Sequence, residues 1–344
     1  MKTLLLLTCL SLAIVPAGCA QVAVPGAGVT GMNVDEVVEI ELLTQTELAD
    51  KIASGWTSVL VPTGGTEIRG PHAVLNVHTL LATKRAVGAA QRVGNTLVAP
   101  TIPFAVSASG GFNAGQWTSF LEDDGPIAPN PGGISVTAEV FKGIQEGYVR
   151  SLAYIGFKDI FVMGDHGGGQ NEMRAVAEEM TADLAEVGVQ VHYVGDFYSK
   201  THDDVNMYMY EHQLPVAGHG GMMETAEMMY WEPTEFAYIR PNFETVPYDG
   251  NSDDYEGWKA RLDARAAAAA AGGGRGGRGG ARGGRGGRGG RGAGAANAAP
   301  RVNNGLSGNP HPATKEIGAD LAEIGISNTV NQVQRLLAAR YGRR

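Results

Sequence analysis

The chain has 344 residues, enough for one large or two smaller domains, and 43% of them are apolar, which allows a full-size core. Its formal net charge of −9 argues against a general nucleic-acid-binding protein, because nucleic acid is itself a polyanion. Both cysteines, Cys9 and Cys19, lie in the first twenty residues, so the rest of the chain is expected to fold without a disulfide and to use no thiol nucleophile.

The first twenty residues have the pattern of an export signal, because a lysine is followed by an apolar stretch, residues 4–15, and then by small residues. This stretch is too short to cross a bilayer of about 30 Å as a helix. Two cleavage sites compete: a lipobox-like PAGC that would leave Cys19 lipidated, and ordinary cleavage after Ala20. We expect an exported protein, either periplasmic or anchored to the membrane as a lipoprotein, with residues 21–33 as a tether.

From residue 34 onward the chain alternates between short apolar runs and amphipathic stretches. A short strand followed by a helix is expected over residues 34–55. Apolar runs bounded by glycine or proline predict strands, and apolar residues at helical spacing predict helices. The further strands are expected at residues 58–64, 96–106, 159–164 and 189–198, and the further helices at 79–94, 135–156, 170–188, after residue 222 and at the end of the chain, within 306–341.

This alternation predicts the α/β class, with a mostly parallel sheet covered by helices on both faces. In such sheets, binding sites lie beyond the carboxyl ends of the strands. Two polar loops, residues 63–72 and 164–171, each follow a strand directly. We therefore expect their side chains to meet at the same edge of the sheet.

Residues 264–300 consist almost entirely of alanine, glycine and arginine and predict a disordered insertion, because they offer no large apolar side chain to bury. The pattern of ordered elements resumes after it, so the insertion interrupts a single domain, residues 34–344. Its RGG repeats are typical of RNA-binding segments, but in an exported protein we expect no nucleic-acid partner.

Three glycine-rich loops carry side chains that can bind metals or transfer protons. For the first loop, the alternative to a functional site is a polar surface loop. For Glu224, the alternative to a functional role is a purely structural one, as an acid that stabilises a helix N-terminus. The four methionines near Glu224 are expected in the core. The residues of interest are Glu67, Arg69, His72 and His78 in the first loop, Asp165 and His166 in the second, and His219 and Glu224 in the third.

Three segments resemble, in order and separation, the motifs of the creatininase family of metal-dependent amidohydrolases: EIRGPHAVLNVH at 67–78, GDHGGGQN at 164–171 and HGGMMETA at 219–226. PGGISV and GLSGNPHPATKEIG are similar to two further family elements. The resemblance covers roughly residues 34–260 and 302–340. It implies a three-layer creatininase-like α/β domain, with a mostly parallel sheet flanked by helices, that forms a homo-oligomer.

The resemblance also implies site residues, with two departures from the family pattern. Arg69 stands where the family has a metal-binding histidine, and His78 stands where it has an aspartate that bridges two metals. A guanidinium cannot ligate a metal, and a neutral imidazole has one lone pair and cannot bridge. We therefore expect one ion per chain, with Zn²⁺ as the first choice and Fe²⁺ or Mn²⁺ as alternatives, and Arg69 in the place of the second ion. The expected metal ligands are Glu67, His78, His166 and Glu224, and the expected catalytic residues are His219 and Arg69.

The implied function is metal-dependent hydrolysis of a C–N bond in a small amide or lactam, with a metal-activated water as nucleophile. His219 would then pass a proton to the leaving nitrogen. The alternative is a non-catalytic binding lipoprotein that keeps the creatininase fold with a degenerate metal site, because two ligand types have changed.

Overall fold

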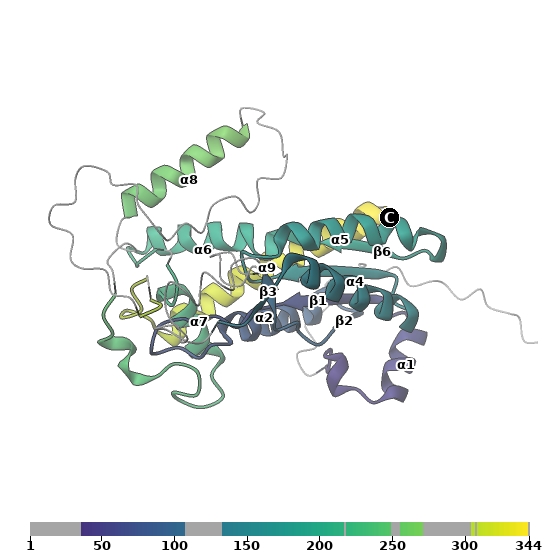
Figure 1. Ribbon diagram of the computed structural model, residues 1–344, viewed down its shortest axis with the longest axis horizontal. Helices are drawn as coiled ribbons and strands as arrows, with labels where there is room; N and C mark the ends of the chain where they lie inside the picture. Colours follow the sequence, from purple (N-terminus) through teal and green to yellow (C-terminus); the bar gives the residue numbers. More distant parts are fainter. Residues whose placement is uncertain are drawn as a thin grey trace, which may run out of the picture.

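The computed structural model describes residues 36–106, 133–216, 218–248, 255–270, 304–306 and 308–342. At its centre lies a four-stranded sheet in the order β2-β1-β5-β6, and every neighbouring pair of strands is parallel (Figure 1). The predicted α/β class and parallel sheet are confirmed. The strands are β1 (Ser58–Thr63), β2 (Thr96–Val98), β5 (Asp159–Gly164) and β6 (Gln190–Tyr193).

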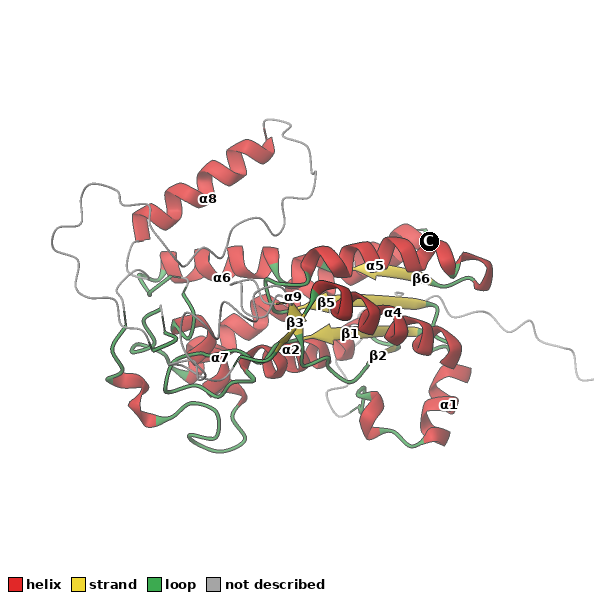
Figure 2. Ribbon diagram, viewed as in Figure 1, coloured by secondary structure: helices red, strands yellow, loops and turns green. Residues whose placement is uncertain are grey.

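Helices cover both faces of this sheet and give three layers (Figure 2). Val59 and Val61 of β1 pack on the face covered by α4 (Ala138–Ile155) and α5 (Gln170–Asp183). Leu60, between them, points to the opposite face, which is covered by α2 (Val77–Val93) and α9 (Lys315–Tyr341). Since successive side chains of a strand alternate in direction, consecutive apolar residues from Val59 to Val61 are what a doubly covered strand requires.

A third apolar cluster lies outside the sheet, among α6, α7, α8 and α9. Helix α7 (Met222–Trp231) buries Met222, Met223 and Met228, as expected for core methionines. Helix α6 (Ser199–Glu211) belongs to this cluster and had no counterpart among the predicted elements. Within the described residues, no helix is both long and apolar enough to cross a membrane.

Three predicted strands differ in the structure. The strand expected at 189–198 is limited to β6 and is followed by a 3-10 turn, Gly195–Phe197. The run at 96–106 divides into β2 and β3 (Ala105–Val106), because Pro100 and Pro103 lack the N–H that a continuous strand needs. Strand β3 pairs instead with β4 (Ser135–Val136). The strand expected before α1 (Gln45–Ala53) is reduced to an isolated bridge at Glu39 and a 3-10 turn.

Helix α8 (Tyr255–Ala270) corrects the start of the predicted insertion, because its last seven residues lie within 264–300. Alanine has the highest helix propensity, and the first glycine after α8 is Gly272, so the alanine run extends the helix. Residues 271–300, like the predicted signal and tether at 1–33, lie outside the described residues.

Candidate metal centre

The site lies at the carboxyl edge of the sheet, where the two central strands end together. Thr63 of β1 is in register with Gly164 of β5, and the backbone N–H of Asp165 donates to the carbonyl of Thr63 at 2.9 Å. The loops that leave these strands therefore start side by side. Glu67 lies on the first loop and His166 on the second, as the sequence predicted, and His78 lies in the first turn of α2.

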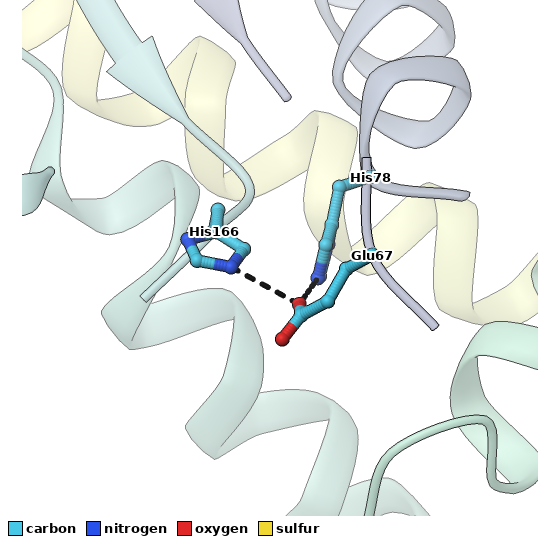
Figure 3. Close-up of side chains that lie close together, drawn as sticks. All are labelled: Glu67, His78 and His166. Carbon is cyan, nitrogen blue, oxygen red and sulfur yellow. Dashed lines mark hydrogen bonds and ion pairs between the residues drawn. The ribbon is translucent and has the colours of Figure 1, made fainter. Parts of the chain in front are cut away.

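Glu67, His78 and His166 each point one ligand atom into the same space, within 4.8 Å of one another (Figure 3). Oε2 of Glu67 is 3.0 Å from Nε2 of His166 and 3.5 Å from Nε2 of His78. Both histidines are buried, whereas the Glu67 side chain is 24% exposed. Two imidazoles and a carboxylate that converge in this way form a donor set suited to Zn²⁺, Fe²⁺ or Mn²⁺.

The glycines after His166 allow this loop to approach the neighbouring backbone. A Cβ at Gly168 would lie 1.7 Å from the carbonyl oxygen of Val106, so only glycine fits. Nδ1 of His166 is 3.0 Å from the Gly168 N–H nitrogen and 3.3 Å from the Gly168 carbonyl oxygen. Either tautomer of His166 thus has a partner at Nδ1, and Nε2 can donate to Glu67 or bind a metal.

Arg69 fills the space between the carboxylates of Glu67 and Glu224 and is almost completely buried. A guanidinium has five N–H groups, and all five have acceptors within the site. Arg69 therefore has no N–H left for a substrate in this arrangement, and it acts as a fixed cation. The acceptors are Glu224 Oε1 at 2.9 Å for Nε, the Ile68 carbonyl at 3.1 Å and His219 Nδ1 at 2.9 Å for Nη1, and Glu67 Oε2 at 2.8 Å and His78 Nε2 for Nη2.

Glu224, predicted as a fourth ligand, lies beside the donor set but is held by other groups. Its Oε1 accepts from Arg69, and its Oε2 accepts from the N–H of Gly220 at 2.6 Å. Oε1 is 3.9 Å from Nε2 of His78. Burial favours the neutral acid, but the positive charge of Arg69, together with His78, His219 and the hydrogen bond from Gly220, holds the pKa of Glu224 below its usual value. Glu224 is thus an ionised partner of Arg69.

His219 lies at the open side of the site, with a side chain that is 56% exposed. Nδ1 accepts a hydrogen bond from Arg69, so the proton of a neutral His219 lies on Nε2. Burial of part of the ring and the nearby Arg69 charge lower the pKa of His219, which favours this neutral form. His72, in contrast, is fully buried, and its Nε2 lies 3.0 Å from Thr225 Oγ1, away from the donor set.

Arg85 was not among the residues predicted for the site, although it is buried beneath it and binds both Asp165 and Glu227. The sequence contains one signal for this role. Arg85 lies on the apolar face of α2, among Leu81, Ala82 and Ala86, and it is about two helical turns from His78. A charged residue in such a position needs a buried partner.

Comparison with known proteins identifies similar chains and folds. A family model described as creatinine amidohydrolase matches residues 41–333. Among solved structures, "Creatininase Mn" is similar with a TM-score of 0.55 and 19% identity, covering 90% of this chain and 100% of the other. A mutant creatininase of the Zn-Zn type is similar with a TM-score of 0.52 and 18% identity, covering 90% and 100%. At these identities the likeness shows the fold.

A curated relative also matches, the mycofactocin precursor peptide peptidase of Mycobacterium ulcerans (strain Agy99). It is 29% identical over 151 residues, which are 42% of this chain and 53% of the relative. The match thus spans about half the length of that protein.

Proposed function

The chain belongs to the creatininase family, since the family model matches most of its length, and from this premise we propose that it is a metal-dependent hydrolase of the C–N bond in a small amide or lactam. The observation that carries the proposal is the convergence of Glu67, His78 and His166 at the carboxyl edge of the sheet, with His219 beside them. This is the place where an open parallel sheet presents its ligands.

The donor set supports a divalent ion held by Glu67 Oε2 and by Nε2 of His78 and of His166. When bound, such an ion supplies a Lewis acid that polarises a carbonyl and activates water. The names of the similar solved structures, which mention Mn and Zn, support a divalent metal. Zn²⁺ is our first choice because two imidazoles and one carboxylate form a common catalytic zinc set.

Arg69 supports one ion per chain, because its fixed positive charge already neutralises the carboxylates that a second ion would bind. Its Nη2 contacts the same Glu67 and His78 atoms that would hold the first ion. The ion cannot bind these two atoms while Nη2 contacts them. Binding of the ion therefore requires Nη2 to move away from Glu67 and His78, while the hydrogen bond from Nε to Glu224 anchors the side chain.

His219 is proposed to act on the leaving group of the substrate. The hydrogen bond from Arg69 to Nδ1 keeps the proton of His219 on Nε2. From the exposed side of the site, this N–H can donate a hydrogen bond to the nitrogen of the amide as the C–N bond breaks, and any proton that His219 passes on must first be taken up from the attacking water. Arg69 thus contributes indirectly, because its hydrogen bond sets the tautomer of His219.

The reaction class is supported from two directions. The family model is described by an amide hydrolysis, and the curated relative is named as a peptidase, so both descriptions refer to cleavage of a C–N bond. A small amide or lactam and a short peptide are therefore the two substrate classes to compare. The competing function is a non-catalytic binding protein with a degenerate metal site, which the contacts of Arg69 with two of the metal donors favour.

Metal analysis and a substrate panel test the proposal. The purified protein is stripped with a chelator, reloaded with Zn²⁺, Fe²⁺ or Mn²⁺ and assayed on lactams, small amides and peptides. We expect one ion per chain, lost in Glu67→Ala and His166→Ala and retained in His192→Ala, a buried histidine outside the site. Two ions per wild-type chain, or full metal content in Glu67→Ala, would contradict this ligand assignment. Binding without cleavage of any amide would favour the non-catalytic function.

A further inference from the structure

A chain of buried ion pairs runs from α7 to the candidate metal centre. Glu227, Arg85 and Asp165 are each at most 2% exposed. Arg85 donates from Nε to Glu227 Oε1 at 2.8 Å and from Nη2 to Glu227 Oε2, and its Nη1 donates to Asp165 Oδ1 at 2.6 Å. The other oxygen of Asp165 lies 2.9 Å from Nδ1 of His78. Three almost completely buried groups are thus linked in series to Nδ1 of His78.

Stability alone does not account for this arrangement. The cost of removing charges from water often exceeds the attraction between them, so that apolar residues of similar size would stabilise the fold equally well or better. The fold nevertheless makes room for the chain: a Cβ at Gly325 of α9 would lie 2.8 Å from Nε of Arg85. A function in which position and charge matter is the remaining explanation.

The contacts determine which nitrogen of His78 carries the proton. An ionised carboxylate only accepts hydrogen bonds, so Nδ1 of His78 must donate to Asp165. The lone pair of neutral His78 is then on Nε2, which accepts from Arg69 in this structure. Asp165 cannot rotate freely, because Arg85 holds its Oδ1 while His78 occupies its Oδ2.

We propose that Glu227, Arg85 and Asp165 are positioning residues that fix the tautomer and orientation of His78, so that its Nε2 lone pair faces Glu67 and His166. This deepens the proposed function, on which it rests only in treating Nε2 as a metal donor. Groups that hydrogen-bond to the far nitrogen of a ligating histidine typically change metal affinity by about 10–100-fold when they are removed.

The opposite end of β5 offers a matched control. Asp159 is also a fully buried carboxylate, and it binds a histidine and an arginine, with His192 Nε2 at 3.1 Å and Arg340 Nη1 at 3.1 Å. Asp159→Asn and Asp165→Asn therefore remove equivalent charges from the two ends of one strand. Arg85→Met with Glu227→Met removes the distant ion pair as a unit and leaves Asp165 in place.

The full-length protein is titrated with Zn²⁺ against a chromophoric chelator, and its melting temperature is recorded in parallel. We expect Asp165→Asn and the double variant to weaken Zn²⁺ binding by about 10–100-fold. Asp159→Asn should lower the melting temperature while it leaves Zn²⁺ affinity within about twofold of wild type. Equal Zn²⁺ affinity in wild type and Asp165→Asn would overturn the proposal.

A second readout needs no metal. In the metal-free protein labelled with ¹⁵N-histidine, the His78 signals, assigned with His78→Gln, should show the proton on Nδ1. In Asp165→Asn, and in the double variant whose Asp165 has lost its anchor, part of the population should move the proton to Nε2. If wild type takes up no Zn²⁺, the proposed function fails, but the tautomer still tests the positioning. An unchanged tautomer in both variants would overturn it.

Discussion

Arg69 shows how one residue changes the balance of charge in a site. Its guanidinium lies between the carboxylates of Glu67 and Glu224 and contacts both within 2.9 Å. Both carboxylates are ionised without a metal. Hydrogen bonds with His166 and His78 and the charge of Arg69 lower the pKa of Glu67 despite its partial burial, and Arg69 contributes most to the lowered pKa of Glu224. The metal-free state is thereby stabilised, and an incoming ion meets a competitor with the same sign of charge.

Arg69→Met should therefore have opposite effects on the two states. The metal-free protein should lose about 3–5 kcal/mol of unfolding free energy, because the buried carboxylate of Glu224 and the partly buried carboxylate of Glu67 lose their partner. Zn²⁺ affinity should rise by about tenfold or more, equivalent to about 1.4 kcal/mol, because the competing cation is gone. Denaturant unfolding and Zn²⁺ titration measure the two quantities, with Arg92→Met, in a partly exposed ion pair with Glu323, as control. Weaker Zn²⁺ binding in Arg69→Met would contradict this reading.

His72 should make the stability of the fold depend on pH. Burial lowers the pKa of His72 to about 4, against 6.5 for an ordinary histidine. Between these values the unfolded chain binds a proton that the folded chain excludes, so unfolding becomes easier as the pH falls. Above pH 6.5 the protonation of His72 does not reduce the free energy of unfolding. Between pH 6.5 and pH 4 it reduces the free energy of unfolding by about 3 kcal/mol.

The measurement compares wild type with His72→Gln, both free of metal, by denaturant unfolding at several pH values between 7.5 and 4.5. The comparison removes the effects of other titrating groups, because they are common to both proteins. Wild type should lose more stability on acidification than the variant. Parallel pH profiles would contradict the prediction, because they would show that His72 has the same pKa in the folded protein and in the unfolded chain.

At the scale of elements, the sequence predicted best where one signal dominates. The interiors of strands β1 and β5 are apolar, and both strands were predicted within one residue of their observed positions. The division of β2 from β3 was missed, because the apolar pattern hid the effect of Pro100 and Pro103. Helix α6 was missed because its sequence is rich in polar residues, and only tertiary packing shows which face is buried.

The site was predictable as far as local rules extend. Glu67 and His166 follow neighbouring strands, so the edge rule for parallel sheets brings them together. The partners of Arg69 and Arg85 were not predictable, since Arg69 meets Glu224 and Arg85 meets Glu227 across 155 and 142 positions of sequence. Such pairs depend on how α2 and α7 pack, which no local pattern specifies.

Two helical glycines should respond to alanine with opposite signs. A Cβ at Gly318 of α9 would lie 2.0 Å from the carbonyl oxygen of Ala226 in α7, so Gly318→Ala must push the helices apart. We expect a loss of about 1–3 kcal/mol of stability. A Cβ at Gly143 of α4 meets no atom within 4 Å, and Gly143→Ala should add about 0.5–1 kcal/mol. Thermal unfolding of the two variants compares them, and a stabilised Gly318→Ala would refute the close helix contact.

At the scale of the whole molecule, α9 joins the parts that build the site. It packs against α2, which carries His78 and Arg85, and against α7, which carries Glu224 and Glu227. The segments on either side of the predicted insertion both contact this body. Trp258 of α8 lies in the same apolar cluster as α7, and Asn304 donates to the carbonyl of Pro247 at 2.9 Å. The chain before and after the insertion is thus held independently of it.

Removal of residues 275–290 from the predicted insertion should therefore leave the fold and the metal content unchanged. Residues 271–274 and 291–303 remain as a linker, which can reach about 55 Å at about 3.3 Å per residue. Helix α8 is about 24 Å long, so a linker of this length can return from its far end to the body of the molecule without strain. Circular dichroism, melting temperature and metal analysis of the deletion variant should match wild type.

A deletion of equal length within α9 is the control that should abolish folding, because α9 buries residues against two neighbouring helices. Insoluble protein from the 275–290 deletion would mean that this glycine- and arginine-rich segment contributes to the folded state, and that its composition was misread.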